Sequence, residues 1–407
     1  MINIVLSFIA LFLIILAFLL LLFVCFIENK SGKKIVPYKN NGRYAILVPA
    51  RNESKVIENL LISIENQTYK VEPKDVYVIV EDECDKTVSI ANNHNVSVII
   101  RTNLENRKRK GYALADAIEN ISTKYDAYFI FDADNILDKN FIKEMSKTIN
   151  EGYDIGIGYR NTKNGSSTLI ASASALTFSM INTFINRKKV KRHHNVIISG
   201  TGYYIKGSIV DNWETFPFNS LTEDYELSLD ATLNGYTTYY NESAIYYDEQ
   251  PEKYKVSIIQ RTRWIKGYFE ARKKYIPKLK NSIINSDVNT LSKVKEVIGV
   301  IPFILIILGI IIYSINLLIL NLQNNTIYKF IYLLIGIILS IYILLALFTI
   351  YLLILEKDKL NISKKNKILV VLFNPIFLLS YVRCLLICIF KRNISWQEIK
   401  HEKTNIE

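Results

Sequence analysis

Acidic side chains directly follow two apolar runs of the sequence, where they could bind a cation or carry a proton. Asp132 and Asp134 come after the run YFIF, and Asp82 follows the run VYVIV. Two carboxylates separated by one residue can hold a hard divalent cation while a substrate diphosphate fills its remaining positions. Such pairs are also common as plain turns after a strand. Because two runs end in acids, the sequence favours a metal and diphosphate site.

Two further segments carry groups suited to proton transfer and anion binding. Glu223 and Asp224 open a helical run, so Asp224 is a candidate general base. The alternative is that both acids only stabilise the start of the helix. Lys110, next to a glycine, is a candidate phosphate ligand, whereas Arg107–Arg109 are interpreted as a solvated run of charge.

A fourth segment, Gln260 to Gly267, combines amide, basic and aromatic side chains. Helical spacing places Gln260, Arg263 and Trp264 on one face. A guanidinium can bind a diphosphate, and an indole can stack on the apolar face of a sugar. A basic helix touching anionic lipid is the alternative interpretation, and the two are compatible.

The composition places these candidates in a membrane protein. Half of the 407 residues are hydrophobic although 22% are charged, so the apolar residues are concentrated in segments. Residues 1–27, 297–320 and 330–355 carry no charge, and each is long enough to cross a hydrocarbon core of roughly 30 Å. This excludes a wholly soluble, a disordered or a secreted disulfide-rich protein. The four cysteines show no disulfide or zinc spacing, which fits a reducing compartment.

The lysines predict the topology of these segments. Three lysines follow residues 1–27, and five lie between residues 356 and 367. By the positive-inside rule, the polar domain is predicted to be cytosolic in a multi-pass protein of the plasma membrane. Residues 368–390 contain Pro375 and Arg383 and have basic flanks, so they are interpreted as re-entrant or interfacial, with 391–407 as a cytosolic tail.

The polar stretch, residues 38–292, predicts one α/β domain. Two helical runs, at Val56–Glu65 and Gly111–Asn120, alternate with four apolar runs: Tyr44–Pro49, Val76–Val80, Val96–Ile100 and Tyr128–Phe131. Continuous apolar runs between helices indicate buried parallel strands, as in a doubly wound sheet. Ligands of such sheets bind beyond the carboxyl ends of the strands, where the acids lie.

Seven motifs in this order resemble membrane-bound family 2 glycosyltransferases, in the branch of the cellulose, hyaluronan, chitin and poly-N-acetylglucosamine synthases. They are VPARNES, VEDECDKT, RKGYAL, FDADN, SGTGYYIK, LTEDYELSL and QRTRWIKG. The resemblance extends from about Ala45 to Lys274. It implies a GT-A fold and inverting transfer of a hexose or N-acetylhexosamine from a nucleotide-diphosphate donor, expected to be a UDP-sugar, in polysaccharide synthesis.

The resemblance also implies roles for individual residues. Asp224 would be the catalytic base, and Asp134 with Asp132 would hold Mg or Mn. The donor would be bound by Pro49, Arg51, Glu53, Asp82, Lys110, Asp132, Gln260 and Arg263. The acceptor would be bound by Gly202, Glu223 and Trp264. The implied partners are a nucleotide-sugar donor, a glycan or lipid-linked acceptor, the lipid bilayer and membrane subunits for glycan export, with no nucleic acid.

Departures from the family pattern leave alternatives open. The VEDECDKT loop is one residue shorter than usual, and Ser199 stands where relatives often have glycine. The membrane part is smaller than in the large polymer synthases, which puts a self-contained channel in doubt. Transfer of one sugar to a polyprenyl phosphate or another lipid is therefore the second hypothesis. A non-catalytic membrane scaffold is the third.

Overall fold

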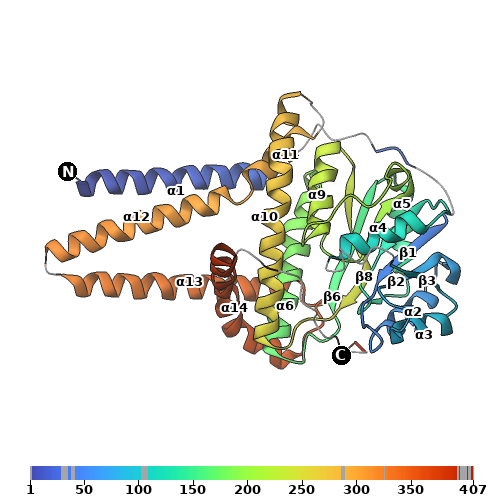
Figure 1. Cartoon of the computed structure of the whole chain (residues 1–407). Helices are drawn as coiled ribbons and strands as arrows, with labels where there is room; N and C mark the ends of the chain where they lie inside the picture. Colours follow the sequence, from blue (N-terminus) through green and yellow to red (C-terminus); the bar gives the residue numbers. More distant parts are fainter. Residues whose placement is uncertain are drawn as a thin grey trace.

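The computed structural model combines an α/β domain with long helices that extend from one side of it (Figure 1). It describes residues 2–28, 35–37, 42–101, 109–285, 289–324, 326–391, 394, 401 and 405–406.

The domain is built on a mixed sheet of eight strands in the order β3-β2-β1-β4-β7-β6-β8-β5. The strands are β1 (Tyr44–Pro49), β2 (Val76–Val80), β3 (Ser97–Ile100), β4 (Ala127–Ile130), β5 (Ile136–Leu137), β6 (Ile155–Thr162), β7 (Tyr203–Lys206) and β8 (Thr238–Asp248). The four strands expected from the sequence, β1 to β4, are parallel neighbours, which confirms the α/β prediction. Beyond them, β7 runs antiparallel to both β4 and β6.

Both faces of the sheet are buried, which explains the continuous apolar runs. Along β1, Tyr44, Ile46 and Val48 enter one hydrophobic core, whereas Ala45 and Leu47 enter the other. Side chains alternate between the faces of a strand, so a strand covered on both sides is apolar throughout. The first core is covered by α2 (Ile57–Glu65), α3 (Lys86–Asn93) and α5 (Phe141–Asn150). The second is covered by α4 (Lys110–Asn120), α8 (Gly207–Val210) and α9 (Glu223–Asn234).

A long helix, α10 (Tyr254–Asn285), lies between the sheet domain and the apolar helices (Figure 1). It packs against α9, against α11 (Thr290–Ile298) and against α14 (Lys364–Phe390). The remaining elements are η1 (Pro73–Asp75) and the consecutive elements α6 (Leu169–Met180), η2 (Ile181–Asn186) and α7 (Arg187–Lys191).

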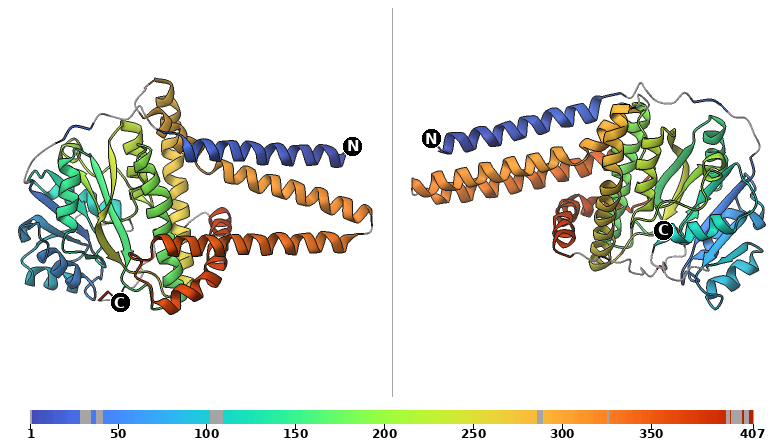
Figure 2. Two further views of the ribbon diagram at one scale, coloured as in Figure 1. Left: turned by 180° about the vertical axis from the view of Figure 1, so that it is seen from behind. Right: turned by 45° about the horizontal axis from the view of Figure 1, so that its top comes forward.

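Three helices project to the same side of the molecule: α1 (Ile2–Phe26), α12 (Ile301–Gln323) and α13 (Ile327–Leu355) (Figures 1 and 2). Among the described residues, five helical stretches are long and apolar enough to cross a membrane, including these three and α14. The fifth, Leu169–Lys191, is largely buried inside the protein. The set fits a membrane protein that carries an α/β domain.

Helix α14 does not extend beside α13 along its length but folds back against the base of α10 and α6 (Figure 1). Arg261 of α10 is fully buried in this contact. Its guanidinium lies 4.0 Å from the ring centre of Phe377 and donates a hydrogen bond of 2.8 Å to Ser380 Oγ. This packing brings one face of α14 next to the α/β domain.

Helix α13 is fixed to the domain through Glu356, which is buried where the helix ends. Its carboxylate accepts hydrogen bonds from Tyr159 Oη (2.8 Å), Thr183 Oγ1 (2.7 Å) and Arg187 (2.9 Å). A buried carboxylate is stable only when it is paired and hydrogen-bonded in this way. The contact therefore fixes how the apolar helices sit on the sheet domain.

Candidate active site

A cavity of about 1030 Å³ lies at the carboxyl ends of β1, β2, β4 and β8 and continues to the apolar helices. One end of it is lined by charged side chains that follow the strands. The other end is lined by Ile304 and Ile307 of α12 and by Val382, Leu385 and Ile389 of α14. The cavity thus joins a charged compartment to an apolar one.

Pro49, Arg51 and Glu53, at and after the end of β1, line the charged end of the cavity. Arg51 Nε lies 3.2 Å from Glu81 Oε2. Burial raises the pKa of Glu53 to about 8. Asp82 is exposed and accepts a hydrogen bond from the Cys84 backbone. In the described part of the chain, Glu81 lines the cavity in its place.

Lys110 and Asp132 form the middle of the charged end. Lys110 Nζ lies 2.5 Å from Asp132 Oδ1 and also donates to the Gly200 carbonyl oxygen at 2.6 Å. The backbone N–H of Asp132 donates to Thr201 Oγ1 at 2.8 Å. The ammonium of Lys110 is therefore held at the end of β4. Arg107 and Lys108 lie outside the described residues.

Asp134 lies beside a different set of charges. It is buried, and one carboxylate oxygen accepts a hydrogen bond of 3.2 Å from the Glu249 backbone. Ligand atoms of Asp134, Glu249 and His401 all lie within 4.8 Å of one another. Carboxylates in such a group fit the divalent cation that the sequence predicted. Asp132 is not a member of this group, because it pairs with Lys110.

Glu223 and Asp224 open α9 and point into the cavity. The Gly200 backbone N–H donates a hydrogen bond to the Asp224 carboxylate. Burial raises the pKa of Asp224, and burial together with the Asp224 charge raises the pKa of Glu223 to about 7. A carboxylate with a raised pKa in a cavity is suited to accept a proton.

Gln260, Arg263 and Trp264 of α10 line the cavity between its two ends. Arg263 donates a hydrogen bond of 3.3 Å to the Leu221 carbonyl oxygen, and the Trp264 ring lies edge-on to Phe178 at 5.5 Å. The glycine of the motif has a packing reason. A Cβ at Gly267 would lie 2.5 Å from Thr222 Oγ1, so a larger residue would push α10 away from the start of α9.

Gly202 lies outside the described lining of the cavity, although the sequence suggested it for acceptor binding. Its φ is +68°, and a Cβ there would lie 2.2 Å from the Tyr246 ring. Gly202 therefore serves the turn before β7 and the packing of Tyr246. Its neighbour Gly200 makes the polar contacts with Lys110 and Asp224 instead.

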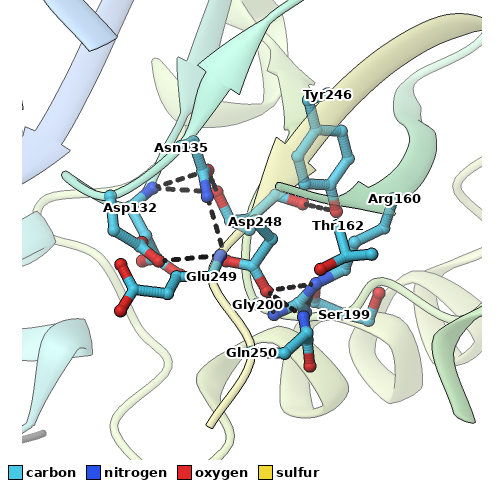
Figure 3. Close-up of polar contacts among 12 residues, drawn as sticks. Asp132, Asn135, Arg160, Thr162, Ser199, Gly200, Tyr246, Asp248, Glu249 and Gln250 are labelled. Carbon is cyan, nitrogen blue, oxygen red and sulfur yellow. Dashed lines mark hydrogen bonds and ion pairs between the residues drawn. The ribbon is translucent and has the colours of Figure 1, made fainter. Parts of the chain in front are cut away.

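Sequence reasoning missed the polar residues at the end of β8. Asp248 pairs with Arg160 of β6, which also donates to the Ser199 carbonyl oxygen at 3.1 Å (Figure 3). Asn135 donates to Asp248 Oδ1 at 3.2 Å (Figure 3). The available signal in the sequence was the polar segment DEQP, which follows a run of strand-forming residues. Its position in the site could be recognised only from the pairing of β8 with β6.

The fold is of the GT-A type, and acids at the strand ends line the charged end of its cavity. The chain matches the model of the glycosyltransferase like family 2 over residues 41–267, and it belongs to this family. It is therefore a glycosyltransferase, as predicted.

One sequence relative and one solved structure are similar to this chain. The probable glycosyltransferase YdaM of Bacillus subtilis (strain 168) is 25% identical over 232 residues. The match covers 55% of this chain and 55% of YdaM, so it spans about half the length of that relative. The mannosyltransferase PcManGT of Pyrobaculum calidifontis, solved with GDP-Man and Mn2+, has a TM-score of 0.54 at 12% identity. That likeness covers 95% of this chain and all of PcManGT, and it supports the fold.

Proposed function

We propose that the protein transfers a sugar, with inversion, from a nucleotide diphosphate to an acceptor carried by a membrane lipid. The observation that carries this proposal is the cavity itself, which joins the charged strand ends to apolar faces of α12 and α14. The charged end suits a nucleotide sugar, with a UDP-sugar as the first candidate. The apolar end offers contacts to a hydrocarbon chain but few partners for sugar hydroxyls.

The chemistry follows from the residues that line the cavity. The acceptor oxygen forms a bond to the anomeric carbon while the bond from that carbon to the diphosphate breaks on the opposite face. Asp224 accepts the proton of the acceptor hydroxyl. Lys110 and Arg263 stabilise the negative charge of the leaving diphosphate. A divalent cation, held by Asp134 and its neighbours, would supply further positive charge when bound.

Elongation of a glycan is the second candidate function. The Q-x-x-R-W segment and the Trp264 ring in the cavity wall favour a sugar acceptor, as in the synthase branch that the sequence resembles. In that case, membrane partner subunits would have to assist export, because the apolar helices are few.

Product analysis distinguishes the two functions. The full chain, purified in detergent, is incubated with labelled UDP- and GDP-sugars and either polyprenyl phosphate or a short glycan. A single organic-soluble glycolipid supports the lipid acceptor, and a ladder of long water-soluble chains supports elongation. No transfer to either acceptor with any donor would contradict both proposals.

The proposed orientation in the plasma membrane has its own test. Nucleotide sugars are cytosolic, so the α/β domain must face the cytosol. A reporter fused after Leu355 is expected to be cytoplasmic, and one near Asn324 external. The reverse pattern would separate the domain from its donor and overturn the proposal.

A further inference from the structure

The short helix α7 lies between the domain-side ends of two apolar helices, α1 and α13. At its carboxyl end, the Arg192 guanidinium lies 5.4 Å from the ring centre of Phe26, the last residue of α1. At its amino end, the Lys188 ammonium lies 5.0 Å from the ring centre of Phe184. The Phe184 ring in turn packs against Tyr351, close to the end of α13. Helix α7 therefore lies at the level where α1 and α13 meet the α/β domain.

This level coincides with the headgroups of a bilayer crossed by α1. The helix has 25 residues and is about 37 Å long at 1.5 Å per residue. A hydrocarbon core is roughly 30 Å thick, so Phe26 would lie at its edge. The Tyr351 side chain on α13 is 52% exposed, and tyrosines of this kind are typical of membrane interfaces. Lipid phosphates would thus surround α7.

Helix α7 and the residue that follows it carry five basic side chains and no acid. Two of these cations are balanced inside the protein. Arg187 pairs with Glu242 and Glu356, and Lys189 pairs with Glu296. These contacts hold one side of α7 against the domain and against the end of α13.

The other three cations, Lys188, Lys191 and Arg192, form a separate face of α7. Residues three and four positions apart are neighbours on a helix, so the three side chains lie together. Lys188 and Lys191 are exposed, and Arg192 is half-buried. Within the described ranges of the chain, no carboxylate lies at ion-pairing distance from any of the three. Their charge therefore suits an anionic partner from outside the protein.

We propose that Lys188, Lys191 and Arg192 form a binding surface for the phosphate groups of anionic membrane lipids. Ammonium groups bind phosphates as point charges, and a guanidinium can bind one with two hydrogen bonds. The three residues lie outside the described lining of the cavity, so this surface is distinct from the proposed active site. It goes beyond the proposed function because it assigns the protein a preference among the lipids around it.

Lipid binding tests this inference directly. Phosphatidylglycerol is titrated into the full chain in a neutral detergent, and bound lipids are counted by native mass spectrometry, with phosphatidylcholine as the neutral comparison. The parent should bind phosphatidylglycerol more tightly. The triple variant Lys188→Gln, Lys191→Gln and Arg192→Gln should bind it at least about tenfold more weakly, because each Lys or Arg near anionic lipid contributes roughly fivefold. The affinity for phosphatidylcholine should not change.

Two control variants remove the same number of charges elsewhere. Lys70→Gln, Lys74→Gln and Lys86→Gln change exposed lysines near α2, β2 and α3, on the side of the domain away from the apolar helices (Figure 1). Lys364→Gln, Lys365→Gln and Lys367→Gln change a second basic group, at the start of α14. Both triple variants should keep nearly the affinity of the parent for phosphatidylglycerol.

A charge-preserving variant separates lipid binding from a structural role. Lys188→Arg, Lys191→Arg and Arg192→Lys together should keep the affinity for phosphatidylglycerol, and the melting temperatures of all variants should stay close to that of the parent. An unchanged affinity in the glutamine variant of α7 would overturn the inference. An equal loss in the α14 variant would overturn it too, since the preference would then be a property of the overall charge.

Inorganic phosphate distinguishes a lipid surface from a general anion site. Phosphate at the concentration of the titrated lipid should leave the bound phosphatidylglycerol in place. Displacement of the lipid by free phosphate would contradict a surface specific to membrane lipids. The assay contains no sugar donor or acceptor, so its result and the result of the transfer experiments are independent.

Discussion

The two ends of the cavity are built in different ways. At the charged end, the functional groups follow strands of one sheet, and hydrogen bonds such as Lys110 to Asp132 and Gly200 hold them in place. At the membrane end, apolar side chains of α12 and α14 line the wall, and their positions depend on helix packing. A polar contact is directional, whereas an apolar contact is not.

This difference predicts different costs of substitution at each end. Removal of one charged group at the strand ends leaves a reacting group without its partner. The loss of turnover should therefore be large, and folding should be unaffected. A substitution in the apolar wall formed by α12 and α14 removes part of a large apolar contact. It should therefore weaken acceptor binding and leave donor binding unchanged.

The largest effect is expected for Asp224→Asn at the charged end. Loss of a general base typically costs about 10²–10⁴ in rate, and donor affinity should stay near that of the parent because the base acts on the acceptor. Turnover, donor affinity and melting temperature are measured together. Asp230→Asn on the same helix, whose side chain bonds Tyr275 and Asn234, is the control and should stay active. Near-normal turnover of Asp224→Asn would leave Glu223, which also lines the cavity, as the acid to test.

Asp134→Asn should lower turnover by about 10²-fold, comparable to the loss of one electrostatic stabiliser of the transition state. The amide keeps the size of the side chain and weakens hard-cation binding, so folding should be preserved. Added chelator should inhibit the parent strongly. Asp138→Asn is the matched control, because the Asp138 side chain accepts a hydrogen bond from the Asn140 backbone and lies outside the described lining of the cavity. Chelator-insensitive transfer by the parent would contradict the metal role.

At the membrane end, Leu385→Asn should weaken the apparent affinity for a lipid acceptor about tenfold. A buried leucine contributes about 1.5–3 kcal/mol, and 1.4 kcal/mol corresponds to tenfold. The affinity for the nucleotide sugar should not change. Leu386→Asn is the control, since Leu386 is exposed on the same helix and outside the described lining. An equal loss in both variants, or a loss in donor affinity, would remove the distinction between the two ends.

The smallest effect is expected for Glu223→Gln, which replaces the acid next to the proposed base Asp224. Because burial raises the pKa of Asp224, the carboxylate becomes protonated at a higher pH than a free aspartate, and turnover should fall as the pH is lowered. The neighbouring Glu223, with a pKa of about 7, is mostly protonated where Asp224 titrates, because burial and the charge of Asp224 raise its pKa. Glu223→Gln should therefore leave the acidic limb of the pH–rate profile nearly unshifted. A profile that is flat at acidic pH, or a limb that moves markedly in the variant, would contradict this order of ionisation.

Much of the charged end could be predicted from the sequence because strand ends of a parallel sheet converge. The apolar runs located β1 to β4, and the polar residues after them were expected in one pocket. Asp82 illustrates the limit of this reasoning. It follows β2 as predicted, but its side chain turns to the Cys84 backbone and Glu81 faces the cavity. Which of two adjacent residues points inward depends on the local turn.

The second half of the site could not be predicted in this way. Asp248 and Glu249 reach the cavity because β8 lies parallel to β6, a pairing of segments separated by a long stretch of chain. The antiparallel placement of β7 between β4 and β6 has no local sequence signal either. Such non-local pairings are decided by the packing of the whole sheet.

From the sequence alone, the apolar segments, the parallel strands, the family and most residues that line the charged end could be predicted, since hydrophobic periodicity and short motifs are local properties. The tertiary structure alone decided which apolar helices line the cavity, that Asp132 pairs with Lys110, and that His401 meets Asp134 and Glu249. These contacts join residues far apart in the chain. Their positions follow from how the helices and strands pack, which no local pattern encodes.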